Sequence, residues 1–297
     1  MSSSDQIESY PRPGKTAIVT GGSSGLGRTS AIALARAGWN VTVTGRRENE
    51  LQESVSLINQ AAGREGAGHF VSGDITKEDV VLRTFHETAE KFGRIDLVFC
   101  NAGISPPNVP LAEQKLSDWQ ATVDVNLTAS WLCAREAFRY MEKQQPQGGR
   151  IIINGSISAY APRPNAQAYT ATKTAMTGLT KTLSLDGRKF NIAVTQIDVG
   201  NAASEMTAKM KSGPGVPQSD GSLRQEPTMN RDWVGKEIVH VAEMPLGVNG
   251  KSQPKSRCTS PLACSLTNAR PVFSIWLSTV ANVVIQATNM PSHVGRG

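Results

Sequence analysis

A glycine-rich turn near the N-terminus constrains the fold of this chain more than any other feature. Residues 15–20 form a short β-branched run, residues 21–27 read GGSSGLG, and a helical pattern then continues to Ala37 and ends at Gly38. Glycine lets the backbone turn tightly, and it lets a pyrophosphate approach the N–H groups at a helix N-terminus. Strand, glycine-rich turn and helix are the context of a dinucleotide-binding loop, although a Gly/Ser turn without a ligand is the alternative.

Short apolar runs and helical patterns alternate along most of the remaining chain. Few hairpin signals separate them, so the strands should be parallel, with helices on both faces of the sheet. The sequence therefore predicts an α/β fold, a doubly wound parallel sheet (Rossmann fold) in a single domain. We expect further strands at 41–44, 70–71, 97–100, 151–154 and 192–197, and helices at 48–62, 76–92, 117–141, 168–190 and 232–243.

The stretch 156–173, SISAYAPRPNAQAYTATK, carries the strongest chemical signal. Tyr169 and Lys173 are four residues apart and share one face of a helix. A fixed ammonium favours the phenolate and lowers the tyrosine pKa from about 10, so the pair is a candidate general acid/base. Ser156 could donate to a substrate oxygen that becomes negative during the reaction. A lone Tyr-x-x-x-Lys is more often a tyrosine packed in the core and a lysine exposed to solvent. The glycine-rich turn at 21–27 nevertheless favours the catalytic interpretation.

The end of the second expected strand reads Gly45-Arg46-Arg47. In doubly wound folds this strand end meets the adenosine ribose, where an acid binds the 2′-hydroxyl and a cation accepts a 2′-phosphate. Gly45 occupies the acid position, so Arg46 and Arg47 favour NADP(H) over NAD(H). The alternative is two solvated arginines at a helix start, an end where cations are unfavourable.

Other polar residues lie at expected helix starts or inside a helix. Thr76 with Asp79 resembles a capping box, which leaves Asp74 as a helix-start residue or an adenine contact. Ser117, with Gln120 three residues on, is expected to start the next helix. Asn126 lies inside that helix, where Asn is a poor helix former, and such misfits tend to occur at functional sites. A tolerated polar residue is the alternative.

Charge and cysteine spacing exclude several classes of protein. The net charge is +6, but residues 250–279 supply four of those charges without an acid, and no basic stripe is interleaved with aromatics, so nucleic-acid binding is disfavoured. The four cysteines form no C-x-x-C and the four histidines are scattered, so we expect no metal site and no disulfide framework.

No apolar run is long enough to span a bilayer, and the polar start of the chain has no signal-peptide core. We therefore expect no membrane association and a cytoplasmic protein, with residues 1–13 as a disordered leader before a domain at 14–297.

Taken together, these motifs resemble those of the short-chain dehydrogenase/reductase family, in its short-subunit branch, over residues 14–249 and 280–297. The motifs occur in family order and spacing: TGGSSGLG at 20–27, Asp74-Ile75, NAG at 101–103, Asn126, Ser156, and YTATK at 169–173.

The resemblance implies roles for individual residues. Tyr169 would donate the proton in reduction, and Lys173 would hold the nicotinamide ribose and lower the tyrosine pKa. Ser156 would polarise the substrate carbonyl, and Asn126 would anchor a water relay. The residues implied to bind NADP are Gly21, Ser23, Ser24, Gly25, Leu26, Gly27, Arg46, Arg47, Asp74, Ile75, Asn101, Ala102, Gly103, Tyr169, Lys173, Val199 and Ser204. A homodimer or homotetramer built through the long helices at 117–141 and 168–190 is also implied.

The chain departs from the family pattern in two places. After the sixth strand the family usually has Pro-Gly and then a Thr that touches the nicotinamide amide, whereas here residues 198–204 read DVGNAAS and Ser204 keeps a hydroxyl. The second departure is residues 250–279, rich in Ser and Pro and without clear periodicity. Two interpretations stay open for this segment: a retained intron read as protein, or a genuine surface insertion, which loop closure tolerates at low cost.

The expected function is hydride transfer between NADP(H) and a carbonyl or secondary alcohol of a small organic substrate, secondary metabolites included. Residues 200–231 are expected to form a lid over that substrate. Two alternatives remain: a catalytically silent NADP-binding regulator on the same fold, or an inactive mis-spliced product of a reductase gene.

Overall fold

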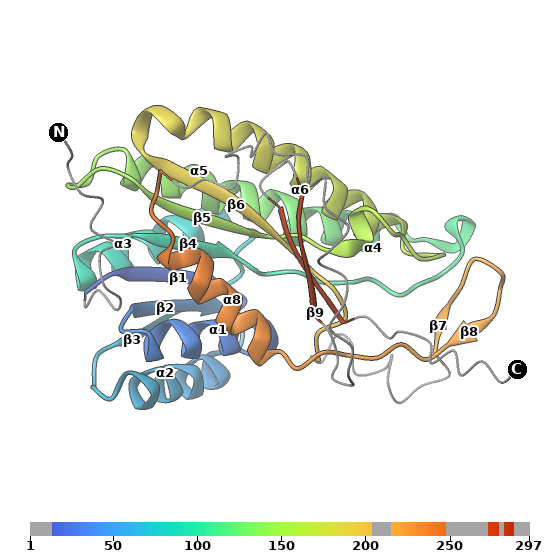
Figure 1. Cartoon of the computed structure of the whole chain (residues 1–297), viewed down its shortest axis with the longest axis horizontal. Helices are drawn as coiled ribbons and strands as arrows, with labels where there is room; N and C mark the ends of the chain where they lie inside the picture. The colour runs from blue at the N-terminus through green and yellow to red at the C-terminus, as the bar shows by residue number, and fades with distance from the viewer. Residues whose placement is uncertain (1–13, 204–214, 248–272, 279–281, 288–297) are drawn as a thin grey trace, which may run out of the picture.

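One large β-sheet organises the chain in the computed structural model, which describes residues 14–203, 215–247, 273–278 and 282–287 (Figure 1). Its strand order is β3-β2-β1-β4-β5-β6-β10-β9, and each neighbouring pair is parallel except β10 with β9. The order 3-2-1-4-5-6 confirms the predicted doubly wound sheet. The strands are β1 (Thr16–Thr20), β2 (Asn40–Gly45), β3 (Gly68–Ser72), β4 (Leu97–Cys100), β5 (Gly149–Asn154), β6 (Ile192–Val199), β9 (Phe273–Ser278) and β10 (Asn282–Ala287).

Helices cover both faces of this sheet because successive strand side chains point to opposite sides. In β1, Ala17 and Val19 enter one core cluster and Ile18 enters the other. The first face is covered by α1 (Gly25–Arg36), α2 (Glu48–Ala62) and α8 (Asp232–Glu243), and the second by α3 (Glu78–Phe92), α5 (Ala129–Met141) and α6 (Gln167–Asp186).

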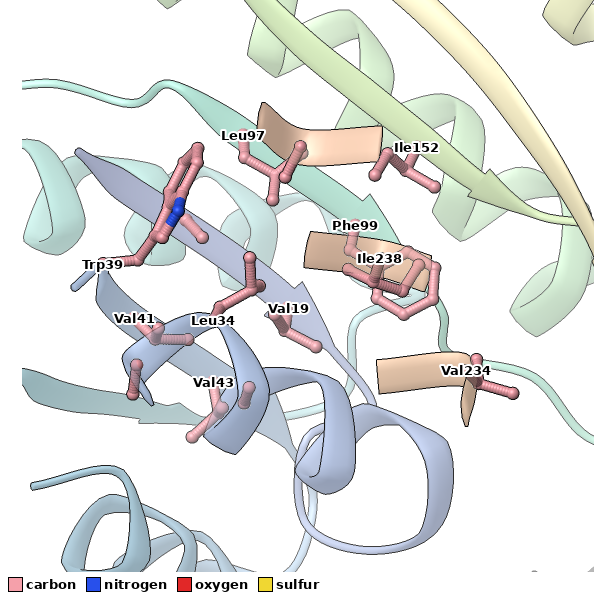
Figure 2. Close-up of a cluster of buried hydrophobic side chains, with 14 of the residues drawn as sticks. Val19, Leu34, Trp39, Val41, Val43, Leu97, Phe99, Ile152, Val234 and Ile238 are labelled. Atoms are coloured by element: carbon pink, nitrogen blue, oxygen red, sulfur yellow. The ribbon is translucent and has the colours of Figure 1, made fainter. Parts of the chain in front are cut away.

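Figure 2 shows part of the first cluster, where Leu34 of α1 and Ile238 of α8 lie near Val19 and Phe99 of the sheet. These four side chains are fully buried. Each such burial is worth about 1.5–3 kcal/mol, so the cluster holds β1 and the turn after it firmly.

The start of α3 corrects one prediction. The helix begins at Glu78, and Lys77 precedes it without a side-chain cap. The main-chain N–H and the hydroxyl of Thr76 both donate to Oδ1 of Asp74, at 3.1 and 2.9 Å. The predicted Thr76–Asp79 capping box is therefore wrong, because Asp74 forms the turn before the helix instead.

The helix predicted over 117–141 consists of three consecutive segments. They are α4 (Leu116–Val123), a π-helical turn η2 (Asp124–Thr128) and α5. Ser117 does not cap α4, which starts one residue earlier after Lys115 and has no side-chain cap. Asn126 lies in the π-helical turn, which places its side chain inside the protein.

The C-terminal part contains one element that the sequence did not suggest. The last parallel strand is β10, paired with β6, and β9 (Phe273–Ser278) lies inside the segment 250–279 that lacks periodicity. Within the expected lid, residues 215–231 include a hairpin of β7 (Val216–Pro217) and β8 (Leu223–Arg224). The expected leader and Ser204 lie outside the described residues. None of the described helices has the length and apolar character needed to cross a membrane.

Candidate active site

The predicted motif residues gather where the strand order reverses. From β1 the chain adds strands first on one side (β2, β3) and then on the other (β4, β5, β6), so the order reverses between β1 and β4. In doubly wound folds, ligands bind at this point, outside the carboxyl ends of the strands. Gly21 follows β1, Asn101 follows β4, and Ser156 lies two residues beyond β5. Because parallel strands end at the same edge, three separate sequence motifs come to one side of the sheet.

The glycine turn is shaped for close approach of a backbone and an anion. Gly21 and Gly25 have φ angles of +68° and +54°, and a Cβ on Gly27 would lie 2.2 Å from the Gly21 carbonyl oxygen. Ser24 is the N-cap of α1 without a side-chain cap bond, and the first turn of α1 has no acidic residue. Free N–H groups at a helix N-terminus favour a phosphate, so the turn fits the pyrophosphate of a dinucleotide.

The NAG segment at 101–103 is fixed directly against this turn by Thr20. The hydroxyl of Thr20 accepts the N–H groups of Asn101 and Ala102, both at 2.9 Å. The side-chain amide of Asn101 donates to the Thr20 carbonyl at 2.8 Å, and Gly103 follows in the same segment. Thr20 was not predicted as a site residue, although its place as the last residue of a buried strand, before the glycines, was a usable signal.

Arg47 lies over the same turn. Its guanidinium donates to the hydroxyls of Ser24 at 2.8 Å and Ser23 at 3.2 Å, and its other terminal nitrogen lies 3.6 Å from Glu50. A cation at the end of β2 and two serine hydroxyls therefore meet where the adenosine end of a dinucleotide would be held. Leu26 continues the turn as a partly buried member of the first core cluster.

Arg46 acts on Asp74 from the neighbouring strand end. Partial burial raises the pKa of Asp74, but hydrogen bonds from Thr76 and the charge of Arg46 outweigh it, so the pKa lies below the ordinary value. Asp74 is thus a carboxylate at neutral pH. The side chain of Ile75 is buried in the second core cluster, which leaves only its main chain for a cofactor.

Ser156, Tyr169 and Lys173 meet at the carboxyl end of β5. The hydroxyl of Ser156 accepts the N–H of Ser158 at 3.1 Å and lies near the phenol of Tyr169, whose pKa it lowers. The Nζ of Lys173 lies 5.6 Å from the centre of the Tyr169 ring and donates to the Asn154 carbonyl at 2.6 Å. The structure therefore brings the three predicted catalytic side chains together.

The electrostatics of this trio differ from the prediction. Burial raises the pKa of Tyr169, and the opposing effects of the Ser156 hydrogen bond and the Arg163 charge do not cancel it. Burial lowers the pKa of Lys173 from 10.5 to about 8, while the charge of Asp198 acts in the opposite direction. The expected lowering of the tyrosine pKa by Lys173 is wrong for the protein by itself, because burial disfavours both charged forms.

Asn126 connects this trio to the loop after β4. Its Oδ1 accepts the Ile104 N–H at 2.8 Å, and its Nδ2 donates to the Ile104 carbonyl at 2.9 Å and to Thr172 Oγ1 at 3.2 Å. The side chain is 1% exposed. It thus fixes the residue next to Lys173, and the implied water relay stays a prediction.

Asp198 is the polar residue near the site that the sequence analysis quoted without giving it a role. It is fully buried in β6, where all eight residues are buried, and it accepts the N–H of Ser156 at 3.0 Å. A carboxylate in an otherwise buried strand was the signal that could have revealed it. Its neighbour Val199 is buried in the first core cluster, so only its main chain could contact a cofactor.

The loop between Ser156 and Tyr169 is tied to the expected lid. Arg163 forms an ion pair with Glu226 and donates to Asn201 Oδ1 at 2.9 Å. The amide of Asn201 donates to the same carboxylate at 2.6 Å. Three loops around the trio therefore share one charged network. Among the described residues no three His, Cys, Asp or Glu side chains form a group that could hold a metal ion.

Comparison with known proteins agrees with this geometry. Residues 15–215 match the family model described as short chain dehydrogenase. The chain is 32% identical over 217 residues to the short chain dehydrogenase/reductase astE of Aspergillus oryzae, covering 73% of this chain and 82% of that protein. It is 33% identical over 200 residues to a 3-oxoacyl-[acyl-carrier-protein] reductase of Synechocystis, covering 67% and 79%.

Solved structures give the same fold. A putative short-chain alcohol dehydrogenase from Sinorhizobium meliloti superposes with a TM-score of 0.67 at 28% identity, over 78% of this chain and 90% of that one. A 3-ketoacyl-(acyl-carrier-protein) reductase from Brucella melitensis, complexed with NADH, gives a TM-score of 0.68 at 22% identity, over 77% and 91%. The second likeness is one of fold alone.

Proposed function

Because this chain belongs to the short-chain dehydrogenase/reductase family, we propose that it transfers hydride between NADP(H) and a carbonyl or secondary alcohol of a small organic substrate. The family match and the relatives support an oxidoreductase that acts on alcohol or carbonyl groups.

One observation carries the proposed chemistry: the Ser156 hydroxyl lies near the Tyr169 phenol, and the Nζ of the buried Lys173 lies 5.6 Å from the centre of the Tyr169 ring. The nicotinamide supplies or accepts the hydride when it is bound. Ser156 and Tyr169 hold the substrate oxygen, and the phenol gives its proton to that oxygen in reduction or takes it back in oxidation. Lys173 lies beside the Tyr169 ring and would hold the nicotinamide ribose, the role that the family resemblance implies for it.

The preference for NADP(H) is supported by the residues around the glycine turn. Gly45 places no carboxylate at the end of β2, and Arg47 is directed over the Ser23 and Ser24 hydroxyls. Arg46 is next to Arg47 in the sequence, and its charge lowers the pKa of Asp74. A 2′-phosphate would accept hydrogen bonds from guanidinium and hydroxyl donors here. Gly21, Gly25 and Gly27 would hold the pyrophosphate through backbone contacts.

We also propose a homodimer or homotetramer in the cytoplasm, with a small-molecule substrate and no nucleic-acid or membrane partner. Leu116 and Trp131, on α4 and α5, are 78% and 43% exposed, which suits a contact between copies along these helices. Light scattering of the purified protein measures the assembly directly, and a monomer would contradict it.

The decisive experiment follows oxidation of NADPH and of NADH across a panel of ketones, aldehydes and quinones. Turnover with NADPH and at least one carbonyl supports the proposal, and a preference for NADH would contradict the cofactor assignment. Binding of NADPH without any turnover would favour the silent regulator. If activity or solubility appeared only after deletion of residues 250–279, the mis-spliced product would be favoured.

A further inference from the structure

Asp198 occupies an unusual position for a carboxylate. It lies on β6 between β5 and β10, in register with Val284, and it has no solvent exposure. A buried charge costs several kcal/mol unless hydrogen bonds and an opposite charge compensate it. A group retained at that cost needs a local explanation.

Three donors converge on this carboxylate. Oδ1 accepts the main-chain N–H of Ser156 at 3.0 Å and the side-chain amide of Gln196 at 2.7 Å, and Oδ2 accepts the hydroxyl of Tyr160 at 3.3 Å. Two of these donors flank the turn that presents the Ser156 hydroxyl. The acid therefore fixes this turn at its start and through the side chain of Tyr160.

Gly155 lets the main chain pass close to the Asp198 carboxylate. A Cβ on Gly155 would lie 2.0 Å from Asp198 Oδ1 and 2.7 Å from the amide nitrogen of Gln196. Only a residue without a side chain lets the turn lie this close to β6. Gly155 and Asp198 thus form one closely packed unit directly before Ser156.

The same network reaches α6, which carries Tyr169 and Lys173. The amide of Gln196 also donates to Thr177 Oγ1 at 3.1 Å, and Thr180 Oγ1 donates to the Gln196 Oε1 at 3.2 Å. Hydrogen bonds therefore run from α6 through Gln196 to Asp198 and on to the Ser156 turn. The relative position of the serine and the tyrosine depends on this chain of contacts.

We infer that Asp198 is a positioning residue of the active site, which acts through the Ser156 backbone and Tyr160 to set the serine hydroxyl against the Tyr169 phenol. The inference rests on the proposed function, because it matters only if these two hydroxyls act on a substrate oxygen. Asp198 also acts on Lys173 through its charge, because it raises the lysine pKa that burial lowers.

Two substitutions at Asp198 separate a positioning role from a purely structural one. Asp198→Asn keeps an oxygen acceptor for the Ser156 N–H, whereas Asp198→Ala removes it. We expect the alanine variant to lose about 100-fold in kcat, the order that misplacement of a catalytic group costs. The asparagine variant should recover most of that loss, and the KM for NADPH should change little in either.

A matched control comes from the opposite face of the same strand. Thr195 is 5% exposed, and its hydroxyl accepts from Arg150 at 3.1 Å, away from the site. Thr195→Val should lower the thermal stability and leave kcat unchanged. If Asp198→Ala behaves like this control, or if Asp198→Asn is as slow as Asp198→Ala, the inference is overturned.

A readout without turnover keeps the inference separate from the proposed function. Amide hydrogen exchange at Ser156 should be slow in the wild type and in Asp198→Asn, and fast in Asp198→Ala, or in Asp198→Ser if the alanine variant does not fold. Equal exchange in all variants overturns the inference even if the enzyme is active. An inactive wild type with the expected exchange pattern would instead contradict the proposed function.

Discussion

The Nζ of Lys173 donates a hydrogen bond of 2.6 Å to the main-chain carbonyl of Asn154, the last residue of β5. This bond joins α6 to the strand that leads to Ser156. The lysine is 4% exposed, so its ammonium is held at a defined place and largely shielded from water. The packing of α6 against β5 therefore fixes the position of Lys173 relative to Ser156.

Lys173 should titrate well below an ordinary lysine. Its pKa lies at about 8, because burial disfavours the ammonium, and Asp198 limits the shift. NMR of protein with 13C-labelled lysine should show one signal with this midpoint, absent in Lys173→Met. In Asp198→Asn the midpoint should fall further, since the opposing charge is lost. The titratable and charged groups around Lys173 are Tyr169 on the same helix, Asp198 on β6 and Arg163 on the loop before α6. A midpoint near 10.5 would contradict the burial argument.

The lowered pKa of Lys173 also predicts how the stability of the protein changes with pH. The folded pKa is depressed from 10.5 to about 8, so the unfolded chain binds more protons between these values. The contribution of Lys173 to the free energy of unfolding should therefore rise with pH across this window. Urea unfolding of the wild type and of Lys173→Met at pH 7.5 and pH 10 measures it: the wild type should gain stability relative to the variant at the higher pH.

Tyr169→Phe should remove the proton donor while leaving the fold intact. We expect kcat to fall by about 10²- to 10⁴-fold, the range that general acid–base catalysis contributes, and NADPH binding to stay nearly unchanged. Tyr140→Phe is the matched control, because Tyr140 packs against Phe85 in α3 with a ring separation of 5.8 Å. Retention of more than a few per cent of activity in Tyr169→Phe would show that the assigned role is wrong.

Replacing Arg46 and Arg47 together by alanine should change the cofactor preference. Loss of hydrogen bonds from charged donors to a 2′-phosphate should raise the Kd for NADPH about 10- to 100-fold and leave that for NADH nearly constant. Adding Gly45→Asp should improve NADH binding, since a Cβ at Gly45 meets nothing closer than 3.5 Å. Arg36→Ala, in the last turn of α1, is the control and should change neither constant. Equal losses for both cofactors would argue against a 2′-phosphate site.

Gly27→Ala should abolish dinucleotide binding, because its Cβ would lie 2.2 Å from the Gly21 carbonyl oxygen. Either the turn opens or α1 moves away from it. Gly178→Ala is a matched control in the exposed part of α6, where a Cβ meets nothing within 4 Å. It should raise the free energy of unfolding by about 0.5–1 kcal/mol, the helix penalty of glycine, without affecting binding. Calorimetric titration with NADPH and urea unfolding give both quantities.

The sheet and most helices could be predicted because apolar periodicity and glycine punctuation act locally. The pattern at 48–62 gave α2 and that at 232–243 gave α8, with the same bounds. The π-helical turn could not be predicted in this way, because Asn126 is drawn inward by the Ile104 main chain, 22 residues away. Likewise β9 pairs only with β10 within the sheet, a contact for which the sequence 250–279 shows no pattern.

Spacing predicted which side chains of the site share a helix face, but not their electrostatics. Tyr169 and Lys173 are four residues apart, and this fixes their proximity. The depth at which α6 lies against β6 decides how strongly both side chains are desolvated, and it depends on contacts such as the hydrogen bond from Thr180 of α6 to Gln196 of β6. The same holds for Asp198, whose hydrogen-bond partners are Gln196 on its own strand and two residues of the turn after β5, Ser156 and Tyr160, about 40 residues earlier in the sequence.

The π-helical turn at 124–128 makes the long α4–α5 stretch sensitive to its residue count. Such a turn accommodates one residue more than a regular helix does, and Asn126 faces inward because of it. Deleting a single residue there would let the main chain close into a regular α-helix, and the inward position of Asn126 would be lost. Substitutions along this surface can accumulate, but a one-residue shortening would uncouple Thr172 from the loop at Ile104, so length here should vary far less than sequence does.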